Sequence, residues 1–391
     1  MYSPKSKPVY RVTVIGCRGR GTAAARAYHA HPRTELVGLC DLVKEARDLL
    51  GNEIGIADRF EDMDQMIRQT APDIVVIATA TDLHYELSMR ILEHGINIEV
   101  EKPICTDLHQ ADQMIAKAQE IGLRIAVHHQ GRVGSAMQAI HNALTAGKIG
   151  RLRYIHCDNK GYYGGYGLMN IGTHKINDML KLAGQCQSVV AQATTRGDSV
   201  TPHDIHQSPG GMGPIVGQHI TAMLQFEQNV TGVLLHHQFS SINLEGSVME
   251  CYGTEGRLFR HTDRVWFCSQ PHYYTPALIS DGWELLSLVY PQTDDPQISA
   301  DDYWFVDEYV QALSQERDHE CSGLAGRHAL EVMTGIFSSI VNGKRVSLPQ
   351  GDRTHPLRRW RQDSGLADLP AMPRSYVEWL KAEGQASSDV L

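Results

Sequence analysis

The stretch Tyr10-Arg-Val-Thr-Val-Ile-Gly16-Cys-Arg-Gly19-Arg-Gly21 decides the fold. Its first six residues are mostly apolar and β-branched, which predicts a strand. A helical segment begins at about Thr22, so the glycines occupy a turn between a strand and the amino terminus of a helix. Gly16 and Gly21 match the first and third glycines of the dinucleotide fingerprint G-x-G-x-x-G, whereas Arg18 stands in its middle position.

A dinucleotide would be held by this turn and by the end of the next strand. The helix amino terminus offers free N–H groups to a pyrophosphate. The cofactor-binding residues expected here are Gly16, Arg18, Gly19, Arg20 and Gly21. Asp41 ends the second predicted strand, where a carboxylate accepts hydrogen bonds from ribose hydroxyls and repels a 2′-phosphate, so the prediction is NAD. Similar turns also occur in α/β proteins without dinucleotides, and the motif alone leaves both readings open.

The first 130 residues alternate strand-like runs with helical stretches, as in a parallel sheet covered by helices. The remaining predicted strands are Glu35–Cys40, Asp73–Ala78, Ile96–Val100 and Arg124–His128. The predicted helices are Thr22–Ala30, Val43–Leu50, Met63–Gln69, Leu83–His94 and Asp107–Glu120.

After a further helix at Ser135–Ala146, the chain carries β-type runs separated by turns, including a hairpin formed by Met223–Phe226 and Thr231–His237. Two helices follow, at Tyr303–Gln315 and Leu324–Val341. The predicted fold class is therefore α/β: a Rossmann dinucleotide-binding domain and an α+β domain with a mostly antiparallel open sheet. The expected domains are residues 1–130, residues 131–350 for substrate binding and oligomerisation, and a carboxy-terminal extension at 351–391.

Composition excludes several classes of function. The 391 residues include 36 Lys and Arg against 45 Asp and Glu, a net charge of −9, which argues against nucleic acid or an anionic membrane as partner. We expect no membrane-spanning segment and no secretory leader. The 8 cysteines form no C-x-x-C pair, so we expect reduced thiols and a cytoplasmic protein.

Several short motifs carry a more specific resemblance. Glu101-Lys102-Pro103 follows a predicted strand and is preceded by Thr79-x4-His84; Gln130-x-Arg132 and Gly172-Thr-His174 come later. In this order and spacing they resemble the Gfo/Idh/MocA family of NAD(P)-dependent oxidoreductases, over most of the chain. The resemblance implies a homo-oligomer, dimer or tetramer, that oxidises or reduces a secondary alcohol on a sugar, a polyol or a close derivative.

The resemblance also implies roles for individual residues. Lys102 would contact the nicotinamide ribose and the reacting hydroxyl, and His174 would accept the proton; Thr79, His84 and Glu101 would join the cofactor site. Alcohol oxidation requires the same residue types, a cation near the oxygen and a base with a near-neutral pKa. Asn170, assigned to the catalytic group, stands where the family usually has Asp, and an amide cannot accept a proton.

The expected substrate-binding residues are Gln130, Arg132, Tyr162, Tyr163 and Tyr166. The tyrosines lie in a glycine-rich segment, and aromatic faces flank sugar rings well; an ordinary turn with exposed tyrosines is the alternative. Gln130 and Arg132 follow the last Rossmann strand, where such sheets place their ligands, or they form a salt bridge at a helix entry.

Histidines also gather in residues 197–217, which include His203-Asp204-Ile-His206. Their spacing matches no known metal site, so we predict no metal, and we expect this stretch to be a lid over the substrate.

Three functions remain open from the sequence. The first is an NAD-dependent dehydrogenase acting on a hydroxyl of a sugar, glycoside or cyclitol. The second is an NAD-dependent glycoside hydrolase that works by transient oxidation and elimination, a reading motivated by Asn170. The third is a protein that senses NAD without catalysis.

Overall fold

The structure is a computed structural model that describes residues 8–272, 282–293, 295–366 and 369–370. The chain divides into two compact units. The amino-terminal unit comprises residues 1–134 and 290–327, and the carboxy-terminal unit comprises residues 135–289 and 328–391. The division differs from the predicted domains at residues 290–327, which group with the amino-terminal unit.

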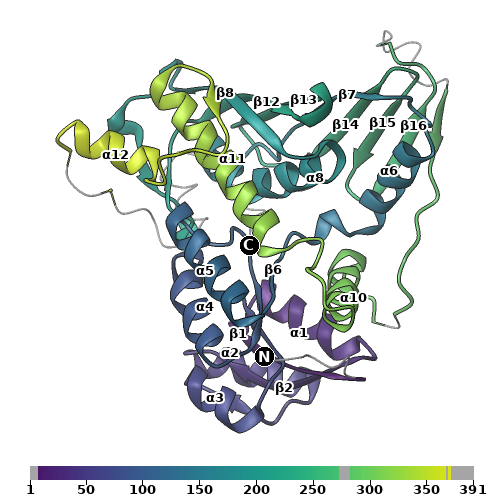
Figure 1. Ribbon diagram of the computed structural model, residues 1–391, viewed down its shortest axis with the longest axis vertical. Helices are drawn as coiled ribbons and strands as arrows, with labels where there is room; N and C mark the ends of the chain where they lie inside the picture. The colour runs from purple at the N-terminus through teal and green to yellow at the C-terminus, as the bar shows by residue number, and fades with distance from the viewer. Residues whose placement is uncertain (1–7, 273–281, 294, 367–368, 371–391) are drawn as a thin grey trace. The chain divides into compact units, whose positions relative to one another are not determined.

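The amino-terminal unit contains a six-stranded parallel sheet in the order β3-β2-β1-β4-β5-β6. Figure 1 labels three of its strands, β1, β2 and β6. Its strands are β1 Tyr10–Ile15, β2 Thr34–Cys40, β3 Arg59–Phe60, β4 Ile74–Ile77, β5 Asn97–Val100 and β6 Ile125–Val127. Its helices include α1 Arg20–Ala30, α2 Lys44–Ile54, α3 Met63–Thr70, α4 His84–Glu93 and α5 Leu108–Ile121. The strand order reverses between β1 and β4, which makes a crevice at the carboxyl ends of these strands.

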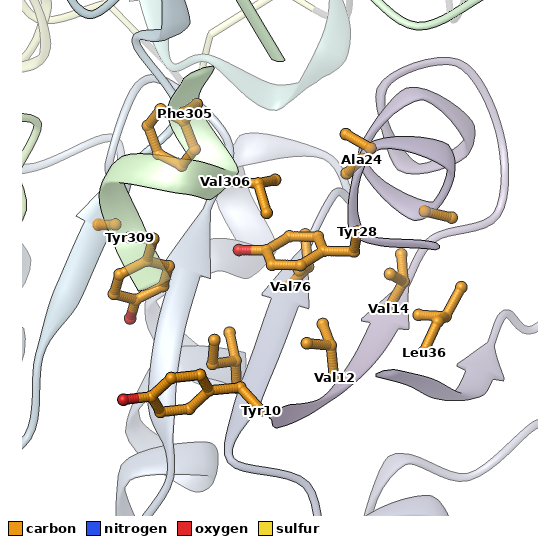
Figure 2. Close-up of a cluster of buried hydrophobic side chains, with 14 of the residues drawn as sticks. Tyr10, Val12, Val14, Ala24, Tyr28, Leu36, Val76, Phe305, Val306 and Tyr309 are labelled. Atoms are coloured by element: carbon orange, nitrogen blue, oxygen red, sulfur yellow. The ribbon is translucent and has the colours of Figure 1, made fainter. Parts of the chain in front are cut away.

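The core of this unit includes a helix from far along the chain. Figure 2 shows Phe305, Val306 and Tyr309 of α10 (Ala300–Ser314) beside Tyr28 of α1 and Val76 of β4. Each of these three α10 side chains is at most 1% exposed. The expected 131–350 domain is corrected here, because the apolar face of α10 completes the core of the Rossmann sheet.

The carboxy-terminal unit contains a large sheet in the order β17-β16-β15-β14-β7-β13-β12-β8-β18. Its strands are β7 Leu152–Cys157, β8 Cys186–Thr195, β12 His219–Phe226, β13 Thr231–His237, β14 Val248–Gly253, β15 Arg257–His261, β16 Arg264–Cys268, β17 Trp283–Leu285 and β18 Val346–Ser347. The pairs are antiparallel except β13 with β7, which are parallel. The predicted hairpin is confirmed as β12 and β13.

Helices α6 Ser135–Thr145, α7 Gly164–Gly167 and α8 Thr173–Ala183 belong to this unit, with a π-helix at Leu168–Gly172 between the last two. Helix α11 spans Gly323–Asn342, and α12 spans Pro356–Asp363. Arg361 of α12 donates to the carbonyl of Pro202 at 3.2 Å, so the described part of the predicted 351–391 extension packs on the same unit. No described helix is long and apolar enough to cross a membrane. All eight cysteines are buried and unbonded.

Candidate functional site

The glycine turn brings the first helix very close to the first strand. Gly16 has a φ of 91°, and a Cβ added there would lie 2.3 Å from the carbonyl oxygen of Ala78. A Cβ on Gly21 would lie 1.8 Å from the carbonyl oxygen of Gly16. Gly16 therefore adopts a conformation that other residues rarely take, and Gly21 lets the first helix pack closely on the turn.

A cavity of about 600 Å³ opens beside this turn, within the usual size of ligand sites. Gly16, Arg18, Asp41 and Thr79 are among the residues that line it. The Asp41 carboxylate accepts backbone N–H bonds from Cys17 through Oδ2 and from Val43 through Oδ1, both at 2.8 Å. These bonds fix the orientation of the carboxylate at the cavity and leave it lone pairs for further donors.

The lining fits an adenine dinucleotide. Two apolar side chains at the cavity are unusually exposed, Leu42 at 80% and Leu83 at 45%, and they offer a surface for a flat base. The exposed Arg18 supplies a cation for a phosphate, and α1 directs its amino terminus toward the same turn. Asp41 offers an acceptor for ribose hydroxyls, as NAD requires.

Two residues expected at the cofactor bond to each other instead. Arg20 Nε donates to Glu101 Oε1 at 2.9 Å, and Arg20 Nη2 donates to Asp302 Oδ1 at 2.6 Å. Glu101 is only 7% exposed. The side chains of Arg20 and Glu101 thus join the glycine turn to the end of β5 and are not among the residues that line this cavity, so their contact with the cofactor stays a prediction.

A buried ionic network continues behind these residues. His128 Nδ1 lies 2.7 Å from Glu99 Oε1, and His128 Nε2 lies 2.9 Å from Asp302 Oδ1. Burial opposes protonation of His128, but the carboxylates of Glu101, Glu99 and Asp302 outweigh it and raise the His128 pKa to about 10. The imidazolium and Arg20 together therefore supply the positive charge that balances the buried carboxylates.

Lys102 directly follows this network at the end of β5. Its backbone N–H donates to Glu101 Oε2 at 3.1 Å, and its side chain is partly exposed. His84, expected at the cofactor, is fully buried, with ring nitrogens 3.0 Å from the carbonyl of Pro103 and 3.2 Å from that of Thr79. His84 therefore links the segments that carry Lys102 and Thr79, and its contact with the cofactor stays a prediction.

Gln130 and Arg132 lie in a short 3₁₀ turn after β6. Both are partly exposed, and Gln130 Oε1 is buried without a hydrogen-bond partner among the described residues. The neighbouring His129 is buried, and burial together with the cations Lys102 and Arg132 lowers its pKa well below the usual value. The turn therefore places Arg132 within electrostatic range of the same neutral imidazole as Lys102.

In the tyrosine segment of the carboxy-terminal unit, Tyr166 lies in the short helix α7, and Tyr162 and Tyr163 directly precede that helix. Tyr162, Tyr163 and Tyr166 are between 2% and 9% exposed, so the alternative of exposed tyrosines is wrong. The ring of Tyr162 meets that of Tyr166 edge to face, with centroids 5.6 Å apart. A Cβ on Gly164 would lie 2.6 Å from the carbonyl of His236, so glycine here allows close packing of α7 on the sheet.

Asn170 and His174 lie on either side of the transition from the π-helix to α8. Asn170 Nδ2 donates to the hydroxyl of Tyr166 at 3.1 Å. Both Asn170 and His174 are partly exposed. A π-helical turn in a helix is often found at functional sites, because its extra residue shifts the register of the side chains that follow. No pattern in the sequence predicted this π-helical turn.

The histidine-rich stretch is an ordered part of the carboxy-terminal unit. Asp204 accepts from the backbone N–H of Thr201 at 2.8 Å and pairs with Arg196 at 3.0 Å. Strands β10 His206–Gln207 and β11 Pro214–Ile215 pair within it. Among the described residues there is no group of three or more His, Cys, Asp or Glu that could hold a metal ion.

These features define a class of protein. A parallel sheet in the order 3-2-1-4-5-6, with a glycine turn and an acidic strand end around a cavity, is a dinucleotide-binding Rossmann domain. Residues 10–129 match the family model described as "Oxidoreductase family, NAD-binding Rossmann fold", and residues 137–259 match the GFO/IDH/MocA C-terminal domain. The chain belongs to the Gfo/Idh/MocA family of oxidoreductases, and its amino-terminal domain is of the NAD-binding type.

Curated relatives are similar to parts of the chain. D-glucoside 3-dehydrogenase of Escherichia coli is 26% identical over 47% of this chain and 57% of the relative. The scyllo-inositol 2-dehydrogenase (NAD(+)) of Bacillus subtilis is 27% identical over 36% of this chain and 43% of its own. The matches therefore cover about half the length of these relatives.

Solved structures share the fold over nearly the whole chain. Levoglucosan dehydrogenase in complex with NADH and levoglucosan aligns with a TM-score of 0.70 at 18% identity, covering 87% of this chain and 99% of that one. The WlbA dehydrogenase from Bordetella pertussis, with NADH and UDP-GlcNAcA, aligns with a TM-score of 0.67 at 22% identity, covering 88% and 99%. At these identities the likeness concerns the fold.

Proposed function

We propose that this protein is an NAD-dependent dehydrogenase that transfers hydride between nicotinamide and the carbon of a secondary hydroxyl in a sugar, glycoside or cyclitol. The observation that carries the proposal is the position of Lys102, whose backbone is held by Glu101, which in turn is held by Arg20. Family membership and the names of the relatives, a glucoside dehydrogenase and an inositol dehydrogenase, support the substrate class.

The glycine turn and Asp41 would hold NAD at the cavity, where it would supply an acceptor for the hydride of the substrate carbon. The Lys102 ammonium stabilises the negative charge that develops on the substrate oxygen as the O–H bond breaks. His174 accepts the proton and passes it to solvent, since its side chain is partly exposed. Asn170 cannot accept the proton. We therefore propose that it orients the hydroxyl group of Tyr166, to which its amide donates a hydrogen bond.

The ionic network behind Lys102 keeps the neighbouring Glu101 negatively charged. Burial would raise the pKa of Glu101, but His128, Arg20 and Lys102 together hold it below its usual value. Glu101 thus stays an anion and orients the backbone of Lys102. A fixed cation requires no rearrangement when charge develops in the transition state.

Tyr162, Tyr166, Gln130 and Arg132 remain our proposed substrate contacts, together with Tyr163. The tyrosines pack against the segment that leads to Asn170 and His174, so they are suited to shape one wall of a sugar site. The buried Oε1 of Gln130, which has no partner among the described side chains, is suited to accept a bond from a ligand hydroxyl.

We also propose a cytoplasmic homo-oligomer. Met223 of β12 pairs with Val190 of β8, and these side chains are 53% and 37% exposed. Adjacent exposed apolar side chains on a sheet face are typical of a protein interface. Light scattering of Met223→Lys should show a smaller assembly than the wild type if this face joins two copies.

The alternative of an NAD-dependent glycoside hydrolase rests on Asn170. Asn170 replaces the carboxylate that the family usually has at this position. Protons would then be transferred by other groups, as in a reaction in which hydride leaves the substrate and returns to it within one turnover. Such an enzyme releases aglycone and accumulates no NADH.

One assay separates these functions. The purified protein is mixed with NAD and a panel of sugars, cyclitols and aryl glycosides, and NADH and aglycone are followed together. We expect steady NADH formation with one sugar class and its loss in Lys102→Met, whereas Lys117→Met, a substitution on α5 away from the cavity lining, should keep it. Aglycone release without net NADH would favour the hydrolase, and NAD binding without any reaction would favour a sensor.

A further inference from the structure

The carboxy-terminal unit holds a group of positively charged side chains that the proposed function leaves unused. This cationic cluster consists of Lys160, Lys175 and Arg260. Lys175 follows His174 in α8 and is only 7% exposed. Lys160 is partly buried in the segment after β7, and the side chain of Arg260, from β15, is 12% exposed.

The sheet register and α8 bring the cluster together. Arg260 pairs with Met249 of β14, and Met249 pairs with Cys157 of β7, so these side chains point to the same face of the sheet. Arg260 Nη1 lies 3.3 Å from Asp178 Oδ2, which shows that α8 covers this face. Lys175 and Asp178 are three residues apart and therefore lie on the same side of α8.

Positive charge is in excess within the cluster. Arg260 is paired with Asp178, whereas the ammonium groups of Lys160 and Lys175 have no hydrogen-bond or ion-pair partner among the residues that the structure describes. Burial lowers the pKa of both lysines, and for Lys175 the nearby cations Arg260 and Lys160 contribute to the shift. Even with Asp158 counted, which acts on Cys157, three basic side chains stand against two carboxyl groups.

The nearby neutral groups do not balance this charge. Burial raises the pKa of the Cys157 thiol to about 12, so it supplies no anion at neutral pH. His236 lies within electrostatic range of Lys175. The pKa of His236 is lowered to about 3, chiefly by burial, so His236 is neutral. An ammonium group that is nearly buried without a partner is costly, and such departures from ordinary burial are concentrated at functional sites.

The cluster borders the segment that carries the candidate catalytic side chains. His236 Nε2 lies 2.7 Å from the position that a Cβ on Gly172 would take, and His236 Nδ1 accepts from Asn159 Nδ2 at 3.1 Å. Gly172 lies between Asn170 and His174. The same imidazole thus contacts the helical turn of the candidate site and lies within electrostatic range of Lys175.

We propose that the cationic cluster binds an oxyanion carried by the substrate, a carboxylate or a phosphate, so that the substrate is an acidic sugar rather than a neutral one. This inference rests on the proposed function, whose substrate class it narrows. An oxyanion would give Lys175 and Lys160 charge-assisted hydrogen bonds and would offset the excess positive charge.

The test compares three probes with the full-length protein saturated with NADH: D-glucuronate, D-glucose 6-phosphate and D-glucose. Binding is measured by calorimetry, and NADH formation is measured separately with NAD. We expect one of the two anions to bind roughly tenfold or more tightly than glucose, and Lys175→Met to remove this preference. Lys344→Met, an exposed lysine of the same unit, should keep it.

Lys160→Met provides a second variant in case Lys175→Met does not fold, because Lys160 is less buried. Preference for glucuronate would assign a carboxylate, and preference for glucose 6-phosphate would assign a phosphate. Glucose binding as tightly as both anions, or an anion preference unchanged in both variants, would overturn the inference; NADH formed from glucose would then leave the proposed function intact. If the anions bind in a lysine-dependent way but no sugar yields NADH, the anion site is supported and the proposed dehydrogenase activity is contradicted.

Discussion

Replacing Asp302 by Asn tests the ionic network behind Lys102. The Asp302 side chain is 4% exposed, and its Oδ1 lies 2.6 Å from Arg20 Nη2 and 2.9 Å from His128 Nε2. Breaking a buried ion pair costs about 3–5 kcal/mol. The amide oxygen still accepts one hydrogen bond, and Arg20 is 38% exposed, so screening reduces its share. We therefore expect Asp302→Asn to lower the free energy of unfolding by about 2–3 kcal/mol at neutral pH.

Urea denaturation followed by circular dichroism measures this change. Asp307→Asn is the matched control, because Asp307 lies on the same helix but its side chain is 29% exposed and sits 3.3 Å from His31. Because Asp307 is partly exposed, solvent screens this pair, and we expect it to be worth about 1 kcal/mol or less. If Asp302→Asn changes stability no more than Asp307→Asn does, the network does not hold this region together.

The effect of Asp302→Asn should also depend on pH. Burial would raise the pKa of Asp302, but His128 and Arg20 outweigh it and hold the pKa well below the usual value. A carboxyl with a lowered pKa contributes stability above its unfolded value, near 4, and loses it as pH falls. The difference between wild type and variant should shrink by about 1.4 kcal/mol for each pH unit below about 4. A difference that stays constant from neutral to acid pH would contradict this reasoning.

Three further predictions concern the amino-terminal unit. Gly21→Ala should weaken NADH binding roughly tenfold or more in a fluorescence titration, because the new Cβ would lie 1.8 Å from the carbonyl of Gly16, whereas Gly351→Ala, with nothing within 4 Å, should not. Asp41→Ala should weaken NAD binding and narrow the preference for NAD over NADP, as competition between the two cofactors would show. The pKa of His128 is raised to about 10, so its contribution to stability is complete below about pH 6.5 and is lost as pH rises toward 10; the wild-type Tm should fall more steeply over that range than the Tm of His128→Gln.

The Rossmann half of the fold could be predicted because its signals are local. Tyr10–Ile15 is strand β1 as expected, and the observed bounds of the other main strands lie within two residues of the predicted ones. Strand β3, Arg59–Phe60, was not predicted, since two residues carry no periodic pattern. Helix α10 was assigned to the wrong unit because its apolar face does not say which core it will join.

The site was less predictable, because its supporting contacts link distant residues. Asp302 and His128 are 174 residues apart, and no local pattern pairs them. Arg20, Glu101 and His84 were assigned to the cofactor from the motifs that contain them, yet all three hold other residues in place. Only the structure separates a side chain that lines the cavity from one that supports it.

In the proposed reaction, hydride passes directly from a sugar carbon to NAD with the help of Lys102. Sugars and cyclitols fully deuterated on carbon, supplied with NAD, test it most directly, with the NADH formed analysed by mass spectrometry. We expect each NADH formed by the wild type to carry one deuterium, and we expect Lys102→Met to form essentially no NADH. NADH without deuterium, or labelled NADH formed equally well by Lys102→Met, would contradict this proposal.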